Sequence, residues 1–215
     1  EWESKKQLSE FGLKIPEGRL VNKDQVKEVV EKLGCPVAIK IVSHEMQHKT
    51  EMGAVAININ SSEEAVRAVE EMIQKLRSSH PNLDTNNLIV EKMLKEPVAE
   101  LLIGIKREHG FGFALVIGSG GTMVELSQDS TTLLLPTSKE AVEQALKRLK
   151  IAKVLDGFRG QTSGDMKSTV EAIMTIAKYA HAKVDSLLEL DVNPLMVMED
   201  DAIAVDAYIR LASKK

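Results

Sequence analysis

The stretch Glu189-Leu190-Asp191-Val192-Asn193-Pro194 and the later pair Val205-Asp206 each close a run of residues that favour β-strands. We expect the two strand ends to present the side chains of Asp191, Asn193 and Asp206 together. Hard oxygen ligands of this kind suit Mg²⁺ held jointly with substrate phosphates. The same residues also fit a plainer structure, in which Asn193-Pro194 forms a turn and Asp206 caps a helix.

A glycine-rich segment lies upstream of this stretch. Gly118-Ser119-Gly120-Gly121 follows a strand predicted over residues 113–117. Glycines at Gly118, Gly120 and Gly121 allow close backbone approach and can turn N–H groups towards an anion. The segment is neither a Walker A loop nor a complete dinucleotide-binding fingerprint, and a simple turn fits it equally well.

A lysine interrupts an apolar run further upstream. Lys40 lies within Val37-Ala38-Ile39-Lys40-Ile41-Val42, which we predict to be a strand. Lysine is rarely buried without a partner. Lys40 therefore lies either on an edge strand that faces solvent or at a site where its ammonium group binds phosphate.

The sequence His44-Glu45-Met46-Gln47-His48 matches the zinc-protease pattern of two histidines separated by three residues. That chemistry needs a helix, whereas strands are predicted on both sides, over 37–42 and 54–59. We therefore treat a zinc hydrolase as a minor alternative. Its possible third ligands are Glu63, Glu64 and Glu70.

The whole chain mixes helices and strands, which predicts an α+β fold. The breakers in His80-Pro81-Asn82-Leu83-Asp84 suggest a linker, so we expect one lobe over residues 1–86 and another over 87–215. A ligand cleft is expected between the two lobes. The expected helices are 23–33, 61–77, 138–150 and 166–180, and the further strands are 88–93, 99–105, 187–192, 195–198 and 202–205.

Composition excludes several classes of partner. The 215 residues carry 28 Lys plus Arg against 32 Asp plus Glu, a net charge of −4, and only 3% are aromatic. Nucleic-acid binding normally needs a basic surface, so it is not expected. No apolar run approaches the roughly 20 residues of a membrane span. A single cysteine, Cys35, fits a reducing compartment, and we expect a cytoplasmic protein.

Together these features resemble the ATP-grasp domain of the NDP-forming acyl-CoA synthetases, on the β-subunit side of ADP-forming acetate–CoA ligase. The resemblance runs in order over about 200 residues. It implies an ATP-grasp fold of two α+β lobes with the nucleotide cleft between them. The segments that carry the resemblance are 5–8, 11–16, 34–40, 43–55, 111–112, 118–121, Val124-Glu125, Asp129, Pro136, 157–160, 191–195 and 205–207.

The resemblance also implies roles for individual residues. Lys40 would contact the nucleotide phosphates and Glu91 would lie at the adenine–ribose hinge. Asn193 and Asp206 would ligate Mg²⁺, with Asp191 nearby. His48 would carry a phosphoryl group on a swinging loop.

The implied reaction is acyl-CoA + ADP + phosphate ⇌ acid + CoA + ATP. The implied cofactors are ATP or ADP and Mg²⁺, and the implied partner is a CoA-binding α subunit or an N-terminal segment that also brings the carboxylic acid. The resemblance implies a β subunit or an excised C-terminal domain, and the start at Glu1 without Met favours excision. The alternative function is a regulatory ATP-grasp module of an acyl-CoA synthetase-like or protein-acetylating enzyme.

The sequence also departs from the family pattern. Ala54 and Ser119 replace glycine and leucine of the family, and residues 130–135, which include Leu133, lack an arginine often found there. Losing a cation near phosphates would weaken binding. The acid and the choice between ADP and GDP are not determined by the sequence.

Overall fold

The protein was analysed as a computed structural model, which describes residues 1–43, 52–108, 110–121 and 128–212. It divides into two compact units. Unit 1 contains Glu1 and residues 3–15 and 96–215, whereas unit 2 contains Trp2 and residues 16–95. Each unit has helices and one antiparallel sheet, which confirms the α+β expectation.

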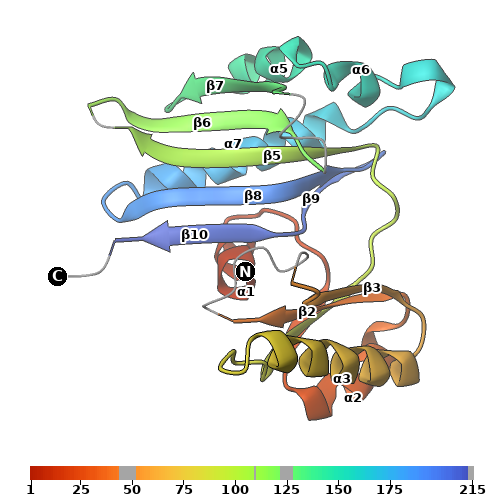
Figure 1. The fold of residues 1–215 in the computed structure, drawn as a ribbon. Helices are drawn as coiled ribbons and strands as arrows, with labels where there is room; N and C mark the ends of the chain where they lie inside the picture. The colour runs from red at the N-terminus through yellow and green to blue at the C-terminus, as the bar shows by residue number, and fades with distance from the viewer. Residues whose placement is uncertain (44–51, 109, 122–127, 213–215) are drawn as a thin grey trace. The chain divides into compact units, whose positions relative to one another are not determined.

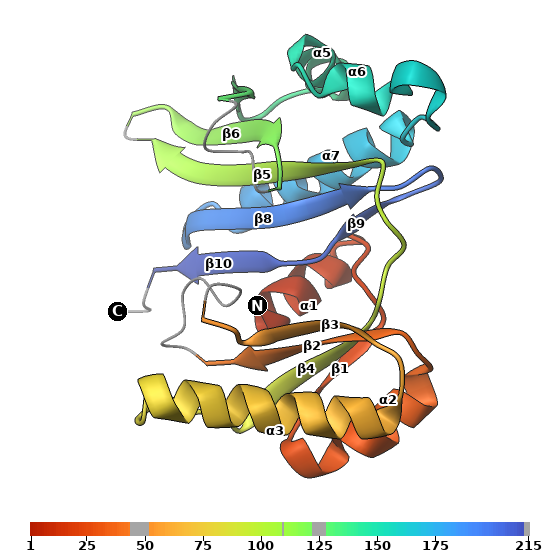
Figure 2. The same ribbon diagram turned by 45° about the vertical axis from the view of Figure 1, so that its right-hand side comes forward.

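Unit 2 is a sheet with two helices on one face (Figures 1 and 2). Within its described residues the strand order is β1-β4-β2-β3, and all pairs are antiparallel. Strand β2 is therefore an inner strand. The elements are β1 (Gly18–Val21), the 3-10 helix η1 (Lys23–Gln25), α2 (Val26–Leu33), β2 (Val37–Val42), β3 (Val55–Ile59), α3 (Ser62–Ser79) and β4 (Asn87–Lys92).

Local sequence explains the helices of unit 2. Asn22 accepts a hydrogen bond from the Asp24 N–H and begins η1, as its capping pattern predicts, but α2 itself starts only at Val26. Ser61 caps α3 by accepting from the Glu64 N–H at 3.1 Å. The apolar sides of α2 and α3 cover Val37, Ile39 and Ile41 of β2 and the matching residues of β4.

Unit 1 is built on the larger sheet. Within the described part of this unit the strand order is β10-β8-β5-β6-β7, with β9 paired to β8. Helices α5, α6 and α7 lie along one face of this sheet (Figure 1). The elements are α1 (Trp2–Glu10), β5 (Ala99–Glu108), β6 (Gly112–Ser119), β7 (Ser130–Leu134), α5 (Lys139–Arg148), α6 (Ala152–Leu155), the 3-10 helix η2 (Phe158–Gly160), α7 (Met166–Ala182), β8 (Leu187–Val197), β9 (Ala202–Ala204) and β10 (Ala207–Leu211).

The first helix belongs to the core of unit 1. Leu8 and Leu13 are buried in the same apolar cluster as the inner faces of β5, β8 and α7. Phe11 packs edge-on against Tyr179 of α7, with ring centroids 5.1 Å apart. The hydroxyl of Tyr179 donates to Gln7 at 2.7 Å. The described helices include none with the length and apolar composition needed to cross a membrane.

The units therefore divide the chain differently from the predicted boundary at residue 86. Residues 3–15 lie in unit 1, because their leucines complete its core, and β4 lies in unit 2, because it pairs with β1 and β2. Three strands were not predicted from the sequence. β1, β7 and β10 are short and polar in part, and their β-structure comes from pairing with longer neighbours.

The expected turn at Asn193-Pro194 is wrong. Both residues lie inside β8, where the register against β5 shifts between Leu101 and Ile103. Proline lacks the N–H needed for regular pairing, and a bulge accommodates it. The helix-cap interpretation of Asp206 is wrong as well, because Asp206 lies between β9 and β10 and no helix follows it in the described chain.

Candidate functional site

Lys40 and Glu91 form a buried ion pair in unit 2. The Lys40 Nζ lies 3.3 Å from a Glu91 carboxylate oxygen, and their side chains are only 8% and 2% exposed. Lys40 is on the inner strand β2, so the solvent-facing edge position considered from the sequence is wrong. Buried charges of this kind are stable only when they are paired.

The pair lies on the sheet face away from α2 and α3. Successive residues of a strand point to opposite faces, and the alternating neighbours Ile39 and Val90 belong to the core beneath the helices. Gly18 of β1 lies directly across from Glu91. A Cβ at Gly18 would be 2.6 Å from the Glu91 Cγ, so the glycine leaves the room that this side chain occupies. Sequence reasoning missed Gly18 because its signal is only the lack of a side chain.

In unit 1 the structure brings Asp191, Asn193 and Asp206 together. Asp191 lies on β8 opposite Tyr208 of β10. The Asn193 N–H donates to the Asp206 carbonyl oxygen at 3.2 Å. The bulge at Asn193-Pro194 thus holds Asn193 next to Asp206, the residue directly before β10. The two segments therefore meet as predicted, but only Asp206 lies at a strand end, whereas Asp191 and Asn193 lie inside β8.

The electrostatics of this cluster fit a cation. Burial raises the pKa of Asp191 from an ordinary 3.8 to about 6, and the negative charges of Asp206 and then Glu189 contribute to the increase. Two carboxylates held close together in a half-buried position repel each other when no cation is bound. The arrangement therefore favours binding of a divalent metal ion.

The donor set fits Mg²⁺ better than a closed metal centre. Across the described residues, no group of three or more His, Cys, Asp and Glu side chains is placed to hold a metal ion. Mg²⁺ typically binds one or two carboxylates and takes its remaining ligands from water and substrate phosphates. Asp191 and Asp206, with the Asn193 amide oxygen, meet that requirement.

Strand β5 separates the glycine segment 118–121 from the acidic cluster, by which we mean Asp191, Asn193 and Asp206. Gly118 on β6 pairs with Leu102 of β5, and Leu102 is opposite the bulge in β8. Two strand spacings correspond to roughly 10 Å. The backbone also requires glycine at two of these positions. A Cβ at Gly120 would lie 2.8 Å from the Glu100 carbonyl carbon, and Gly121 has a φ of +83°.

The histidine pattern, residues 44–48, lies wholly outside the described residues. His44, Glu45 and His48 all lie in residues 44–51. The three glutamates considered as further zinc ligands are described and are already engaged. Glu63 pairs with Lys27, Glu70 pairs with Lys23, and the Glu64 carboxylate accepts from the Asn60 N–H.

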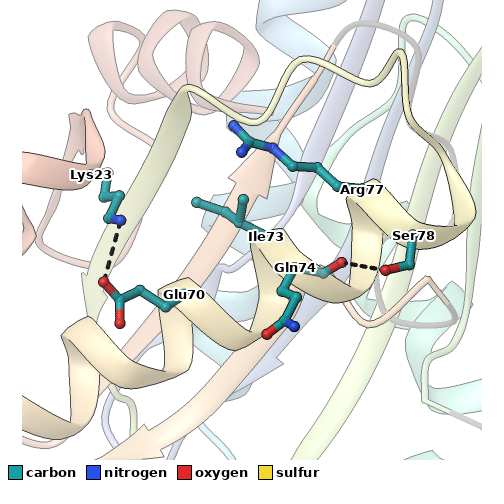
Figure 3. Close-up of a pocket in the computed structure, with 6 residues that line it drawn as sticks. All are labelled: Lys23, Glu70, Ile73, Gln74, Arg77 and Ser78. Atoms are coloured by element: carbon teal, nitrogen blue, oxygen red, sulfur yellow. Dashed lines mark hydrogen bonds and ion pairs between the residues drawn. The ribbon is translucent and has the colours of Figure 1, made fainter.

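A hollow of about 520 Å³ lies elsewhere in unit 2 (Figure 3). It opens beside α3, and Figure 3 shows the Lys23–Glu70 ion pair at its side. Its lining is mostly exposed and includes none of the residues predicted to bind nucleotide or magnesium. The hollow is therefore no candidate for the chemistry. Its lining residues are Lys23, Glu70, Ile73, Gln74, Arg77 and Ser78.

Comparison with known proteins places the chain in a family. A profile described as "ATP-grasp domain" matches residues 1–211. The chain is 31% identical to the β subunit of ADP-forming acetate–CoA ligase II from Pyrococcus furiosus, over 98% of this chain and 90% of that subunit. It is 34% identical to the ADP-forming acetate–CoA ligase of Methanocaldococcus jannaschii, over 93% of this chain but only 29% of that longer protein.

Solved structures agree with the sequence comparisons. Dinucleotide-forming acetyl-coenzyme A synthetase 1 of Ca. Korarchaeum cryptofilum, in complex with coenzyme A, Ca-AMPCP and HgCl⁺, is 30% identical with a TM-score of 0.92, over 98% of this chain and 92% of that chain. Another structure of that enzyme holds coenzyme A and Mg-AMPPCP, with its phosphohistidine segment pointing towards the nucleotide-binding site. It has 29% identity and a TM-score of 0.84, over 99% of this chain and 92% of that chain.

These matches confirm the ATP-grasp fold that the motifs predicted. They extend over nearly the whole chain, and both units are included. The chain belongs to the ATP-grasp domain family, and it is similar along nearly its whole length to the β subunits of ADP-forming acetate–CoA ligases.

Proposed function

We propose that the chain is the nucleotide-binding, phosphoryl-transferring part of an ADP-forming acid–CoA ligase. The overall reaction is acyl-CoA + ADP + phosphate ⇌ acid + CoA + ATP. One observation carries the proposal. A chain that matches ligase β subunits along its length also holds two carboxylates, Asp191 and Asp206, whose mutual repulsion calls for a cation.

The charged groups of unit 2 have the chemistry of a nucleotide contact. Lys40 supplies a point charge for the phosphates, and its buried pairing with Glu91 fixes the position of the ammonium group. Glu91 contacts the adenine–ribose part in this proposal. Gly118, Gly120 and Gly121 of unit 1 let the backbone approach the phosphates closely.

Asp191, Asn193 and Asp206 are the residues proposed to hold Mg²⁺. When bound, the ion neutralises negative charge on the nucleotide phosphates. Metal binding requires an ionised Asp191 carboxylate, and the backbone of Asn193 is hydrogen-bonded to that of Asp206.

His48 is the proposed phosphoryl carrier. Neutral imidazole is a good nucleophile near pH 7. In the direction that consumes ATP, one imidazole nitrogen forms a bond to the γ-phosphorus, the bond from that phosphorus to the bridging oxygen breaks and ADP leaves. The reverse transfer makes ATP from phosphohistidine and ADP. Magnesium and the nucleotide are thus the cofactors of this half-reaction.

The proposed partner is a CoA-binding α segment, which brings CoA and the carboxylic acid. In one longer relative, the segment that matches this chain makes up 29% of the length, whereas other relatives are separate β subunits. The partner is thus either a second polypeptide or another part of the same one. We also propose a cytoplasmic location, since CoA and ATP are available there.

The test is phosphorylation of the purified chain by γ-labelled ATP with Mg²⁺. Wild type is compared with His48→Ala, Asp206→Ala and the control His80→Ala, which changes an exposed histidine after α3. We expect acid-labile, base-stable label on wild type and on the control. His48→Ala and Asp206→Ala should carry no label.

Label that persists in His48→Ala would refute the phosphohistidine at this position. Nucleotide binding that depends on Asp206 but never leads to label, even with an α segment added, would favour the regulatory module. A chain that binds no nucleotide would refute both functions.

A further inference from the structure

Lys5 is a charged residue that the proposed function leaves without a role. It lies on α1 and its residue is 0% exposed. Its Nζ is 2.8 Å from a carboxylate oxygen of Glu1, whose side chain is also fully buried. Removing two charges from water is costly, and replacement by apolar residues is often neutral or stabilising. A buried pair at this place therefore calls for an explanation beyond packing.

The second contact of Lys5 supplies one. Its Nζ donates to the carbonyl oxygen of Val205 at 3.0 Å. Val205 directly precedes Asp206, and its own N–H donates to the Pro194 carbonyl oxygen at 3.0 Å. Lys5 thus holds Val205, the residue that precedes Asp206 and is itself hydrogen-bonded to Pro194, the residue that follows Asn193.

Other parts of the first segment hold the same region on both sides of Val205. The Ser4 hydroxyl accepts from the Ile209 N–H at 3.1 Å, and the Lys14 carbonyl oxygen accepts from the Ala204 N–H at 2.9 Å. The N-terminal segment therefore fixes the connection from β9 to β10 at three points.

We propose that Lys5 is a positioning residue of the metal site. It acts through the Val205 carbonyl group and keeps Asp206 in register with Asn193. Without it the 205–206 backbone loses its outer support, and the cluster must be ordered by the metal ion itself. This inference rests on the proposed function, because that function assigns the metal to this cluster.

The test uses Mn²⁺, an EPR-visible substitute for Mg²⁺, titrated into the full chain with ADP. The main variant is Lys5→Met combined with Glu1→Gln, since Lys5→Met alone would take the ammonium group away from the buried Glu1 carboxylate. The matched control is Lys14→Met, which removes an exposed ion pair with Asp201 next to β9. ADP binding without any divalent metal is measured in parallel.

We expect the double variant to weaken Mn²⁺ binding about tenfold, the usual cost of losing a group that orients a ligand. Lys14→Met should leave Mn²⁺ affinity unchanged, and metal-free ADP binding should be the same in all variants. Equal Mn²⁺ affinity in wild type and the double variant would overturn the inference alone. A parallel loss of metal-free ADP binding would do the same, because it indicates general damage.

Absence of Mn²⁺ binding in wild type would overturn both the inference and the metal assignment of the proposed function. Should the double variant not fold, Ser4→Ala decides the matter, because it removes only the hydroxyl that contacts Ile209. Weaker Mn²⁺ binding by Ser4→Ala supports the bracing role, and unchanged binding overturns it.

Discussion

At Asp191, burial and the negative charges of Asp206 and Glu189 all disfavour the ionised carboxylate. The raised pKa means that the folded protein binds a proton here more tightly than the unfolded chain does. Between about pH 4 and pH 6 the folded state still holds this proton, whereas the unfolded chain has largely lost it. The free energy of unfolding of the metal-free protein therefore falls as the pH rises through this range. Asp191→Asn removes this penalty.

We therefore expect Asp191→Asn to be more stable than wild type at pH 7 by about 2 kcal/mol. The difference should vanish below about pH 3, where the wild-type carboxyl is protonated in both the folded and the unfolded state. Urea unfolding in EDTA at the two pH values measures it. Equal stability of the two proteins at pH 7 would contradict the interpretation.

The Lys40–Glu91 pair leads to a different prediction. Lys40→Met leaves the Glu91 carboxylate buried without this partner, and we expect a loss of about 3–5 kcal/mol in the free energy of unfolding. Lys40→Met combined with Glu91→Gln should recover most of that stability but should not recover nucleotide affinity. Lys92→Met, at an exposed neighbour on β4, is the control.

Chemical denaturation together with nucleotide titration separates the two effects. If the double variant bound nucleotide as wild type does, the pair would be purely structural.

For single residues, the sequence predicted which side chains have a chemical role better than it predicted their burial and their partners. The apolar neighbours of Lys40 marked it as unusual, but only the sheet order shows that its strand is internal. The partner Glu91 lies far along the chain, and Gly18 matters only through the space beside that partner. Such relations depend on long-range pairing, which no local pattern encodes.

At the scale of elements, β6 and its glycine segment depend on close approach to β5. The Gly120 N–H donates to the Glu100 carbonyl oxygen at 2.6 Å, and a Cβ would lie 2.8 Å from that carbonyl carbon. We expect Gly120→Ala to cost about 1–3 kcal/mol, because the backbone must move apart.

The control is Gly104→Ala on β5. A Cβ there meets its nearest neighbour at 3.6 Å, an ordinary contact, so stability should change little. Thermal unfolding of both variants makes the comparison. Equal stability of Gly120→Ala and Gly104→Ala would show that the segment tolerates displacement.

Strong local patterns predicted individual elements well, and pairing-dependent ones poorly. The limits of β2 were predicted exactly from Val37–Val42, and the Ser61 cap was correct for α3. Asn193-Pro194 looks like a turn in isolation. It lies inside an eleven-residue strand because β5 and β10 pair on either side of it.

For the whole molecule, the assignment of residues 3–15 to unit 1 predicts how fragments behave. Residues 16–95 contain a complete core of their own, so we expect this fragment to fold alone. Residues 96–215 lack Leu8, Leu13 and the support of Lys5, so we expect them to fold poorly.

Adding a peptide of residues 1–15 to fragment 96–215 should restore cooperative unfolding. Circular dichroism and amide NMR spectra of the fragments, with and without the peptide, provide the measurement. Full stability of fragment 96–215 without the peptide would show that the first helix is dispensable.

The place of the first helix has a further consequence during synthesis on the ribosome. Translation produces residues 1–15 before unit 2, whereas the β9–β10 segment that they contact is produced after it. Unit 2 is nearly continuous in sequence, so it can bury its core while translation proceeds. Until β8, β9 and β10 have been made, Leu8 lacks the core of unit 1 and Lys5 lacks the Val205 carbonyl group, so Asp206 is supported from α1 only after these strands have emerged.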